Sequence, residues 1–229
     1  MKSPKQRRLI FDIETVADPI EKLDPAQQEY LLKFATTEEE RLETIQRMAL
    51  FPFTSRVVAI AMLNPDTQNG KVLFESDRSV DERTEDEGIT VHYISSDEKG
   101  ILQMFWSDIH HYGQVVTFNG RGFDCPYLLL RSAMLHVKPT RNLMPYRYDP
   151  ANHCDLLDQL TFYSAYKKFN LDFYCKAFNI ISPKEQGVTG HDIGELVAKK
   201  KYREIAEYCF RDVKATAELF RRWESYLRF

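Results

Sequence analysis

The stretch RRLIFDIET (residues 7–15) decides the fold, because it joins a buried strand to a pair of carboxylates. Its apolar residues predict a strand in an α/β core. Side chains two residues apart on a strand share a face, so Asp12 and Glu14 project together, opposite Phe11 and Ile13. Such carboxylates repel each other unless a cation compensates, and oxygen ligands favour Mg²⁺ or Mn²⁺. Taken alone, the triplet fits both a divalent-metal site and a solvated strand end.

The rest of the chain predicts a mixed sheet flanked by helices. Further strands are expected at RVVAIAMLN (56–64), KVLFES (71–76), ITVHYIS (89–95) and QVVTFN (114–119). Helix starts are expected at Asp24-Pro25 with Gln27, at Thr36 or Thr37 with Glu39 or Glu40, at Asp97, at Phe123-Asp124 and near Lys201. This pattern indicates an α/β fold with a five-stranded sheet. It is organised as a single domain over residues 1–229, with a helical insertion at 17–55.

The formal net charge of −3 is unevenly distributed. Residues 75–98 hold nine acids and two bases, so the rest of the chain carries +4, which suits a weak hold on phosphates. Within this region, residues 77–88 have few apolar side chains and are expected to form an acidic, solvated loop. Such a loop would either repel phosphates near the substrate path or be a remote surface feature.

The composition excludes several classes of protein. No apolar run approaches the roughly 18 residues that a membrane span requires, and the basic start MKSPKQRR lacks the apolar region of a secretory signal. The four cysteines form no Cys-x-x-Cys pair, so neither a zinc site nor a disulfide framework is indicated. A cytoplasmic protein in reducing surroundings, with no membrane partner, is therefore expected.

The segment NGRGFD (119–124) follows one expected strand and opens a helix. Its glycines permit backbone conformations and a close approach that other residues would hinder. A dinucleotide-binding fingerprint would need a third glycine where Cys125 stands, so that interpretation fails. Taken singly, Asn119 and Asp124 fit helix capping better than catalysis.

The terminal helix carries Tyr208 and Asp212, which lie four residues apart on one helical face. An apolar stripe of Ile205, Cys209 and Val213 runs beside them. The phenol and the carboxylate can therefore reach one point in space. Taken singly, the pair fits better an exposed aspartate beside a tyrosine packed at the rim of the core.

Together, the three segments resemble the DEDD superfamily of 3′–5′ exonucleases, which has a ribonuclease H-like (DnaQ-like) fold. The motifs of that superfamily run Asp-x-Glu, Asn-x-x-x-Phe-Asp and Tyr-x-x-x-Asp. The tyrosine marks the DEDDy branch, since the histidine branch would place a histidine where Glu207 stands. Over residues 8–222 the chain is most similar to predicted exonucleases related to the proofreading domain of family-B DNA polymerases. Supporting matches are His153-Cys154-Asp155-Leu156, Pro183-Lys184 and Thr189-Gly190-His191-Asp192.

The resemblance implies metal-dependent hydrolysis of phosphodiester bonds from the 3′ end of single-stranded nucleic acid, DNA rather than RNA, with release of nucleoside 5′-monophosphates. It implies two divalent ions, Mg²⁺ or Mn²⁺. Their ligands would be Asp12, which bridges both ions, with Glu14, Asp124 and Asp212. Tyr208 would orient the attacking water, and Asn119 and Phe123 would hold the terminal nucleotide. Replication or repair proteins are the implied protein partners.

Two other interpretations remain from different classes. A ribonuclease H-like endonuclease would share the fold and the metals but cut internally, and the Tyr208-x-x-x-Asp212 motif favours the exonuclease over it. A non-catalytic nucleic-acid-binding module would share only the fold, and the intact set of four carboxylates counts against it.

Several polar and aromatic residues between the motifs are expected to be structural. His153 and Asp155 fit a helix start, and Lys167, Lys168 and Lys184 fit solvated lysines that could touch phosphates. The nearby aromatic residues are expected mostly in the core: Phe162, Tyr163, Tyr166, Phe169 and Phe173.

Overall fold

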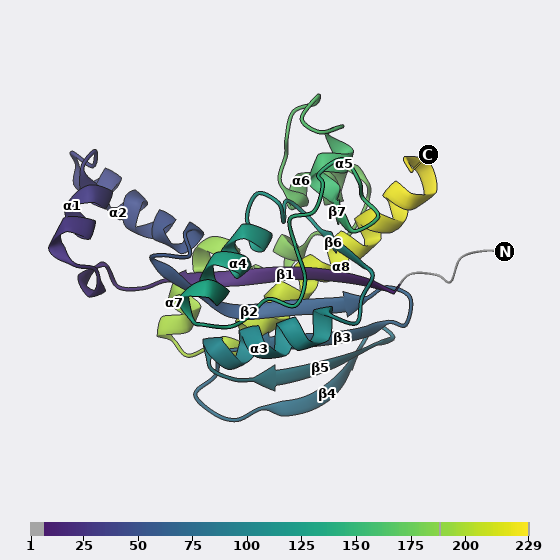
Figure 1. Cartoon of the computed structure of the whole chain (residues 1–229), viewed down its shortest axis with the longest axis horizontal. Helices are drawn as coiled ribbons and strands as arrows, with labels where there is room; N and C mark the ends of the chain where they lie inside the picture. The colour runs from purple at the N-terminus through teal and green to yellow at the C-terminus, as the bar shows by residue number, and fades with distance from the viewer. Residues whose placement is uncertain (1–6, 188, 229) are drawn as a thin grey trace.

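The computed structural model describes residues 7–187 and 189–228, which form one mixed sheet with helices on both faces (Figure 1). The strands are β1 (Arg8–Ala17), β2 (Ser55–Asn64), β3 (Asn69–Phe74), β4 (Asp81–Asp86), β5 (Ile89–Ser95), β6 (Gln114–Thr117) and β7 (His153–Asp155). Their order is β4-β5-β3-β2-β1-β6-β7. β1 runs antiparallel to β2 and parallel to β6. The expected α/β class is confirmed, but the sheet has seven strands rather than five.

Helices connect and cover these strands. The α-helices are α1 (Pro25–Leu32), α2 (Glu38–Arg47), α3 (Glu98–Ile109), α4 (Asp124–Met134), α5 (Leu156–Leu160), α6 (Leu171–Ala177), α7 (Ile193–Ala198) and α8 (Tyr202–Tyr226). Short 3₁₀ turns are η1 (Ile20–Lys22), η2 (Met48–Leu50), η3 (Pro183–Gln186) and η4 (Gly190–Asp192). No helix among the described residues is both long and apolar enough to cross a membrane. Residues 1–6 of the basic start lie outside the described residues.

Each face of the sheet buries its own hydrophobic cluster, because side chains alternate along a strand. Ile10 of β1 packs in the cluster that includes α8, whereas Phe11 and Ile13 pack in the cluster that includes α3 and α4. Figure 1 shows α3 and α4 in front of the sheet and α8 behind it. The alternation therefore places Asp12 and Glu14 on the face that α8 covers.

The strand β7 was not expected, because its residues fit a helix start. It is only three residues long, which is too short for an alternating pattern to be recognised. Asp155 ends this strand and also caps α5, since its carboxylate accepts from the N–H of Leu157 at 3.0 Å. The helix start was thus correct, and the strand before it was missed.

The acidic segment 77–88 is not a loop throughout, which corrects the expectation from sequence. Its residues 81–86 form β4, an edge strand antiparallel to β5. The acids of β4 pair with bases of α8: Arg203 bridges to Glu82, and the Nζ of Lys214 lies 2.7 Å from Asp86 Oδ2. Because these bases lie more than 100 residues further along the chain, local sequence patterns could not indicate the strand. A charged edge strand also discourages pairing with another sheet.

Replacing residues 77–87 with a short Gly/Ser linker is expected to destabilise the protein. β4 covers the edge of β5, whose Val91 and Tyr93 are buried. Exposing them should lower the free energy of unfolding by more than about 3 kcal/mol in chemical denaturation. The matched control Glu82→Gln removes one exposed ion pair and should cost less than about 1 kcal/mol. A linker variant as stable as the wild type would contradict this role of β4.

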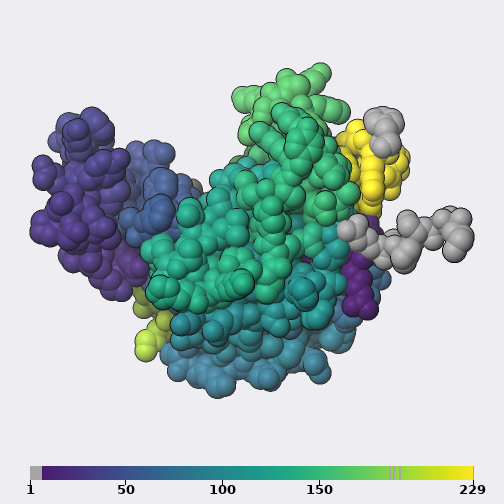
Figure 2. Space-filling model, in the orientation of Figure 1, coloured from purple at the N-terminus to yellow at the C-terminus, as the bar shows by residue number. Residues whose placement is uncertain are grey.

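The insertion after β1 forms an arm (residues 18–53) that extends from the body of the protein (Figures 1 and 2). Its helices begin as the sequence predicts, because Asp24 and Thr37 each cap their helix within a capping box. Neither α1 nor α2 buries any residue, and isolated helices this short are marginal in water. The base of the arm is fastened to β1, where the Oγ1 of Thr15 donates to the carbonyl of Ala49 at 2.7 Å.

Candidate active site

The carboxylates of β1 meet the start of α4 at the edge of the strand that faces β6. β1 pairs with β6 only as far as Ile10. Beyond that point, the N–H of Ile13 donates to Asp124 Oδ1 at 3.1 Å. Asp124 thus takes the place of a strand partner on this edge, and its carboxylate lies beside Asp12 and Glu14.

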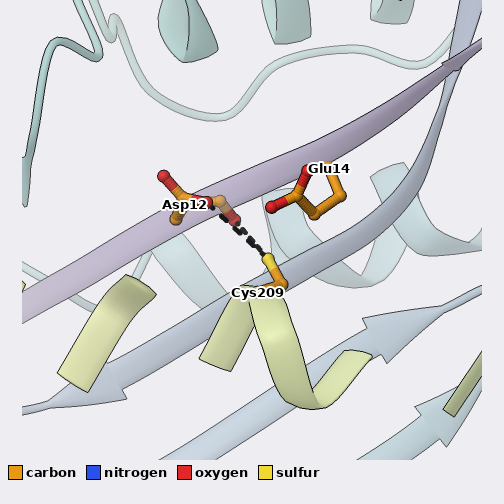
Figure 3. Close-up of side chains that lie close together, drawn as sticks. All are labelled: Asp12, Glu14 and Cys209. Atoms are coloured by element: carbon orange, nitrogen blue, oxygen red, sulfur yellow. Dashed lines mark hydrogen bonds between the residues drawn. The ribbon is translucent and has the colours of Figure 1, made fainter. Parts of the chain in front are cut away.

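Helix α8 closes the same site from the covered face of the sheet. The Sγ of Cys209 lies 3.5 Å from the carbonyl oxygen of Asp12 and 3.9 Å from its Oδ2 (Figure 3). One ligand atom from each of Asp12, Glu14 and Cys209 lies within 4.8 Å of the others. Tyr208 and Asp212 lie beside Cys209 on α8, and the Tyr208 hydroxyl hydrogen-bonds to Asp212. Burial, followed by the charges of Asp212, Glu14 and Asp12, raises the pKa of Tyr208.

Burial and mutual repulsion make the charged forms of these carboxylates unfavourable. The pKa of Asp12 is raised well above its ordinary value, first by burial and then by the charges of Asp124 and Asp212. Burial likewise raises the pKa of Glu14, and it raises the pKa of Asp124 and of Asp212 to about 7. A divalent cation would offset this cost, and four oxygen-donor carboxylates are a ligand set that Mg²⁺ or Mn²⁺ prefers. The residues present therefore fit such an ion.

The loop between β6 and α4 is held by the buried carboxylate of Asp155. Its Oδ1 accepts from the N–H of Asn119 at 2.9 Å, and its Oδ2 accepts from the N–H of Arg121 at 2.8 Å. Asn119 has a φ of 62°, and a Cβ at position 120 would lie 2.3 Å from Thr117 Oγ1. The turn therefore requires Gly120, as the close approach expected from the sequence suggested.

Phe123, rather than Asn119 or Asp124, occupies the N-cap position of α4, and it makes no side-chain cap bond. Capping therefore does not account for the carboxylate of Asp124, which bonds to β1 instead. The ring of Phe123 packs against Tyr127, with 5.5 Å between the ring centroids, and remains only partly buried. Part of this ring can contact a ligand beside the carboxylates.

Two neighbours of the site were not assigned to it from the sequence. Cys209 precedes Asp212 by three residues and so shares its helical face, which is a signal that spacing alone could have provided. Asp155 was expected to be structural, and its bracing of the Asn119 turn depends on β7, which the sequence pattern did not reveal. His153 fits its expected structural role, because burial lowers its pKa to about 4 and its Nε2 lies 2.8 Å from Thr117 Oγ1.

Comparison with known proteins identifies the family to which the chain belongs. Residues 53–227 match the family model described as a predicted 3′–5′ exonuclease related to the exonuclease domain of PolB, the family B DNA polymerases. The chain belongs to this family. The segment that matches this PolB-exonuclease-related family includes residues 119–124 and 208–212, and it begins after β1 with Asp12 and Glu14.

Similar proteins are much longer than this PolB-exonuclease-like chain. It is 26% identical over 231 residues to DNA polymerase 1 of Saccharolobus solfataricus. The aligned region covers 94% of this chain and 22% of that protein. The solved family B DNA polymerase from the hyperthermophilic archaeon Pyrobaculum calidifontis is similar with a TM-score of 0.62 and 20% identity, over 96% of this chain and 25% of that one. The structural likeness confirms the expected ribonuclease H-like fold. The chain spans about a quarter or less of either polymerase.

The metal-free protein is expected to lose stability as the pH rises from about 4 to about 7. Folding raises the pKa of Asp124 and of Asp212 from 3.8 to about 7, so the folded state binds protons more tightly than the unfolded state. The stability from these groups is complete below the unfolded pKa and is lost as the pH rises through the folded pKa. In EDTA, the thermal midpoint should fall by at least about 5 °C across this range.

Saturating Mn²⁺ is the control for this pH dependence, because a bound cation favours the charged carboxylates and should reduce the fall in midpoint. A thermal midpoint in EDTA that stays level or rises with pH would contradict the electrostatic account of the site.

Proposed function

We propose that the protein is a metal-dependent 3′–5′ exonuclease of the DEDDy type, which hydrolyses phosphodiester bonds from the 3′ end of single-stranded nucleic acid. The observation that carries the proposal is the carboxylate pair of β1: ligand atoms of Asp12 and Glu14 lie within 4.8 Å of Cys209 on α8, and the Ile13 N–H between them bonds to Asp124 of α4. Asp212 follows Cys209 by three residues on the same helix. Membership in a family of predicted exonucleases supports it.

The chain's own residues account for the main requirements of this reaction. Asp12, Glu14, Asp124 and Asp212 would hold two divalent ions, Mg²⁺ or Mn²⁺, which supply positive charge at the phosphate and lower the pKa of bound water. Tyr208 keeps its proton at ordinary pH, because burial and the nearby carboxylates raise its pKa. Its hydroxyl can therefore position the attacking water. Asn119 and Phe123 would hold the terminal nucleotide, and the products would be nucleoside 5′-monophosphates.

The substrate and the extent of the catalytic unit are part of the same proposal. Both similar polymerases are DNA polymerases by name, which supports DNA over RNA as the substrate and replication or repair proteins as partners. The two hydrophobic clusters share one sheet, which supports a single exonuclease domain with the arm as an insertion.

The test uses 5′-labelled single-stranded DNA, duplex DNA and RNA, each incubated with Mg²⁺ or Mn²⁺ and with an EDTA control. The expected result is a ladder that shortens one nucleotide at a time from the 3′ end, fastest on single-stranded DNA, with no cleavage in EDTA. Internal fragments at early times would instead indicate the ribonuclease H-like endonuclease. Binding without cleavage under either metal would indicate a non-catalytic nucleic-acid-binding module.

A further inference from the structure

Aromatic side chains that the sequence assigns mostly to the core instead face solvent. Tyr166 is 72% exposed and Phe162 is 56% exposed, with 6.1 Å between their ring centroids. Tyr146 and Tyr148 are also exposed, and the ring of Tyr148 lies 4.7 Å from that of Tyr163. We call the exposed rings of Tyr146, Tyr148, Phe162 and Tyr166 the aromatic platform. Contiguous groups of exposed apolar side chains commonly mark binding sites.

The backbone that presents the platform is strained. Phe162, Tyr163 and Ser164 have φ values of 48°, 58° and 75°, so three consecutive residues other than glycine are left-handed. Bulky residues rarely adopt this conformation, and where it persists it clusters at ligand-binding segments. Several hydrogen bonds hold the turn; among them, the N–H of Tyr163 donates to Asp158 O at 2.7 Å, and that of Tyr166 donates to Thr161 O at 3.0 Å. The turn holds its aromatic rings in solvent instead of burying them.

The platform is tied to the candidate active site through Arg121. The backbone N–H of Arg121 is held by Asp155, in the loop that carries Asn119 and Phe123. The guanidinium of Arg121 donates to the carbonyl of Pro145 at 3.0 Å and to that of Tyr146 at 3.3 Å. One residue thus joins the turn beside the carboxylates to the backbone of Tyr146, the first residue of the platform. Figure 2 shows the lobe that contains α5 and α6 on one side of a broad hollow, with the arm on the other.

Two exposed lysines follow the rings of Phe162 and Tyr166. Residues 161–170 contain Lys167 and Lys168 and no acid, and Lys167 Nζ lies 5.2 Å from the centroid of the Phe169 ring. The arm across the hollow also exposes aromatic rings, on Tyr30 and Phe34, but residues 18–53 hold eight acids against four bases. A phosphate backbone is therefore attracted to Lys167 and Lys168 and repelled by the arm.

We propose that the aromatic platform binds unpaired bases of the strand behind its 3′ end, by stacking, while Lys167 and Lys168 contact the phosphates. Every base has an aromatic face, so stacking on such rings does not depend on base sequence. Bases in a duplex are stacked and paired already, so the platform selects single strands. This inference rests on the proposed exonuclease function and adds to it the feature that recognises the substrate.

The test measures binding of a fluorescent 12-nucleotide single-stranded DNA by anisotropy, in EDTA, so that no cleavage occurs. The variant Tyr148→Ala/Phe162→Ala/Tyr166→Ala should bind at least about 30-fold more weakly than the wild type, and Tyr166→Ala alone about fivefold more weakly. The substituted side chains are exposed, so the thermal midpoint should change little. The variant Tyr166→Trp keeps an aromatic ring, so, unlike Tyr166→Ala, it should bind as tightly as the wild type. The strand should quench the fluorescence of the introduced tryptophan.

Two matched controls separate stacking from other effects. A 12-mer with abasic sites behind its last two nucleotides keeps the phosphates but lacks the bases, so wild type and triple variant should bind it equally. The variant Tyr30→Ala/Phe34→Ala removes rings from the arm that are even more exposed, and it should keep the wild-type affinity within about twofold.

The outcomes distinguish this inference from the proposed function. Equal affinity of the triple variant and the wild type for the ordinary strand would overturn the platform, whether or not the protein degrades DNA. An equal loss on the abasic strand would overturn stacking. A wild-type dimer that becomes monomeric in the triple variant, with DNA affinity unchanged, would reassign the platform to self-association. If the protein binds DNA in a base-dependent way but produces no ladder, the proposed role of the platform stands and the proposed exonuclease function is wrong.

Discussion

Asp12→Asn and Asp212→Asn are each expected to abolish nuclease activity while leaving the fold intact. Each substitution removes one oxygen ligand and one negative charge from a cluster of four carboxylates, and with them the positive charge that would stabilise the phosphate as it reacts. Losing such electrostatic stabilisation commonly lowers the rate by about 10²–10³-fold or more. The measurement is the single-turnover rate on 5′-labelled single-stranded DNA at saturating Mg²⁺.

The same variants should be at least as stable as the wild type when no metal is present. The pKa of Asp12 is raised because burial and neighbouring charges disfavour its ionised form, and an asparagine has no charge to bury. The thermal midpoint in EDTA at about pH 8 should therefore stay level or rise. The control Glu218→Gln, on an exposed position of α8, should alter neither rate nor midpoint. If the Asp12 or Asp212 variant keeps more than a tenth of the wild-type rate, the substituted residue is not a metal ligand.

Those parts of the site that depend on local periodicity could be predicted from the sequence. Asp12 and Glu14 share a face because they are two residues apart on a strand, and Tyr208 and Asp212 share a face because they are four apart on a helix. These relations hold in any fold that contains the strand and the helix. That the two pairs meet each other is a long-range property, and only the resemblance to a known family indicated it.

Features that depend on distant partners could not be predicted in this way. The acids of β4 fit a solvated loop until Arg203 and Lys214 of α8 are known to lie opposite them. The exposure of Phe162 depends on a left-handed turn without glycine, for which the sequence carries no signal. Aromatic composition therefore predicted burial where the backbone produces an exposed surface.

Tyr208→Phe is expected to slow the chemical step strongly while leaving Mn²⁺ affinity unchanged once Asp212 is ionised. The phenylalanine ring keeps the packing of a side chain that is only 4% exposed, so the substitution removes the hydroxyl and little else. Loss of one group that positions water or handles a proton commonly costs about 10²–10⁴-fold in rate. The measurement is the single-turnover rate, combined with calorimetric titration of Mn²⁺ into wild type and variant.

This substitution separates the tyrosine's chemistry from its packing, because the two readouts respond differently. Since the hydroxyl also acts on Asp212 through hydrogen bonding that lowers its pKa, its removal should raise that pKa and shift the onset of metal binding to slightly higher pH. At a pH high enough for Asp212 to be ionised in both proteins, Mn²⁺ affinity should be equal and only the rate should fall. The matched control Tyr226→Phe removes a hydroxyl from an exposed position on the same helix and should change neither quantity. If the Tyr208→Phe variant has the wild-type single-turnover rate, the Tyr208 side chain contributes only packing. The carboxylates of β1 and α8 would then have to position the water.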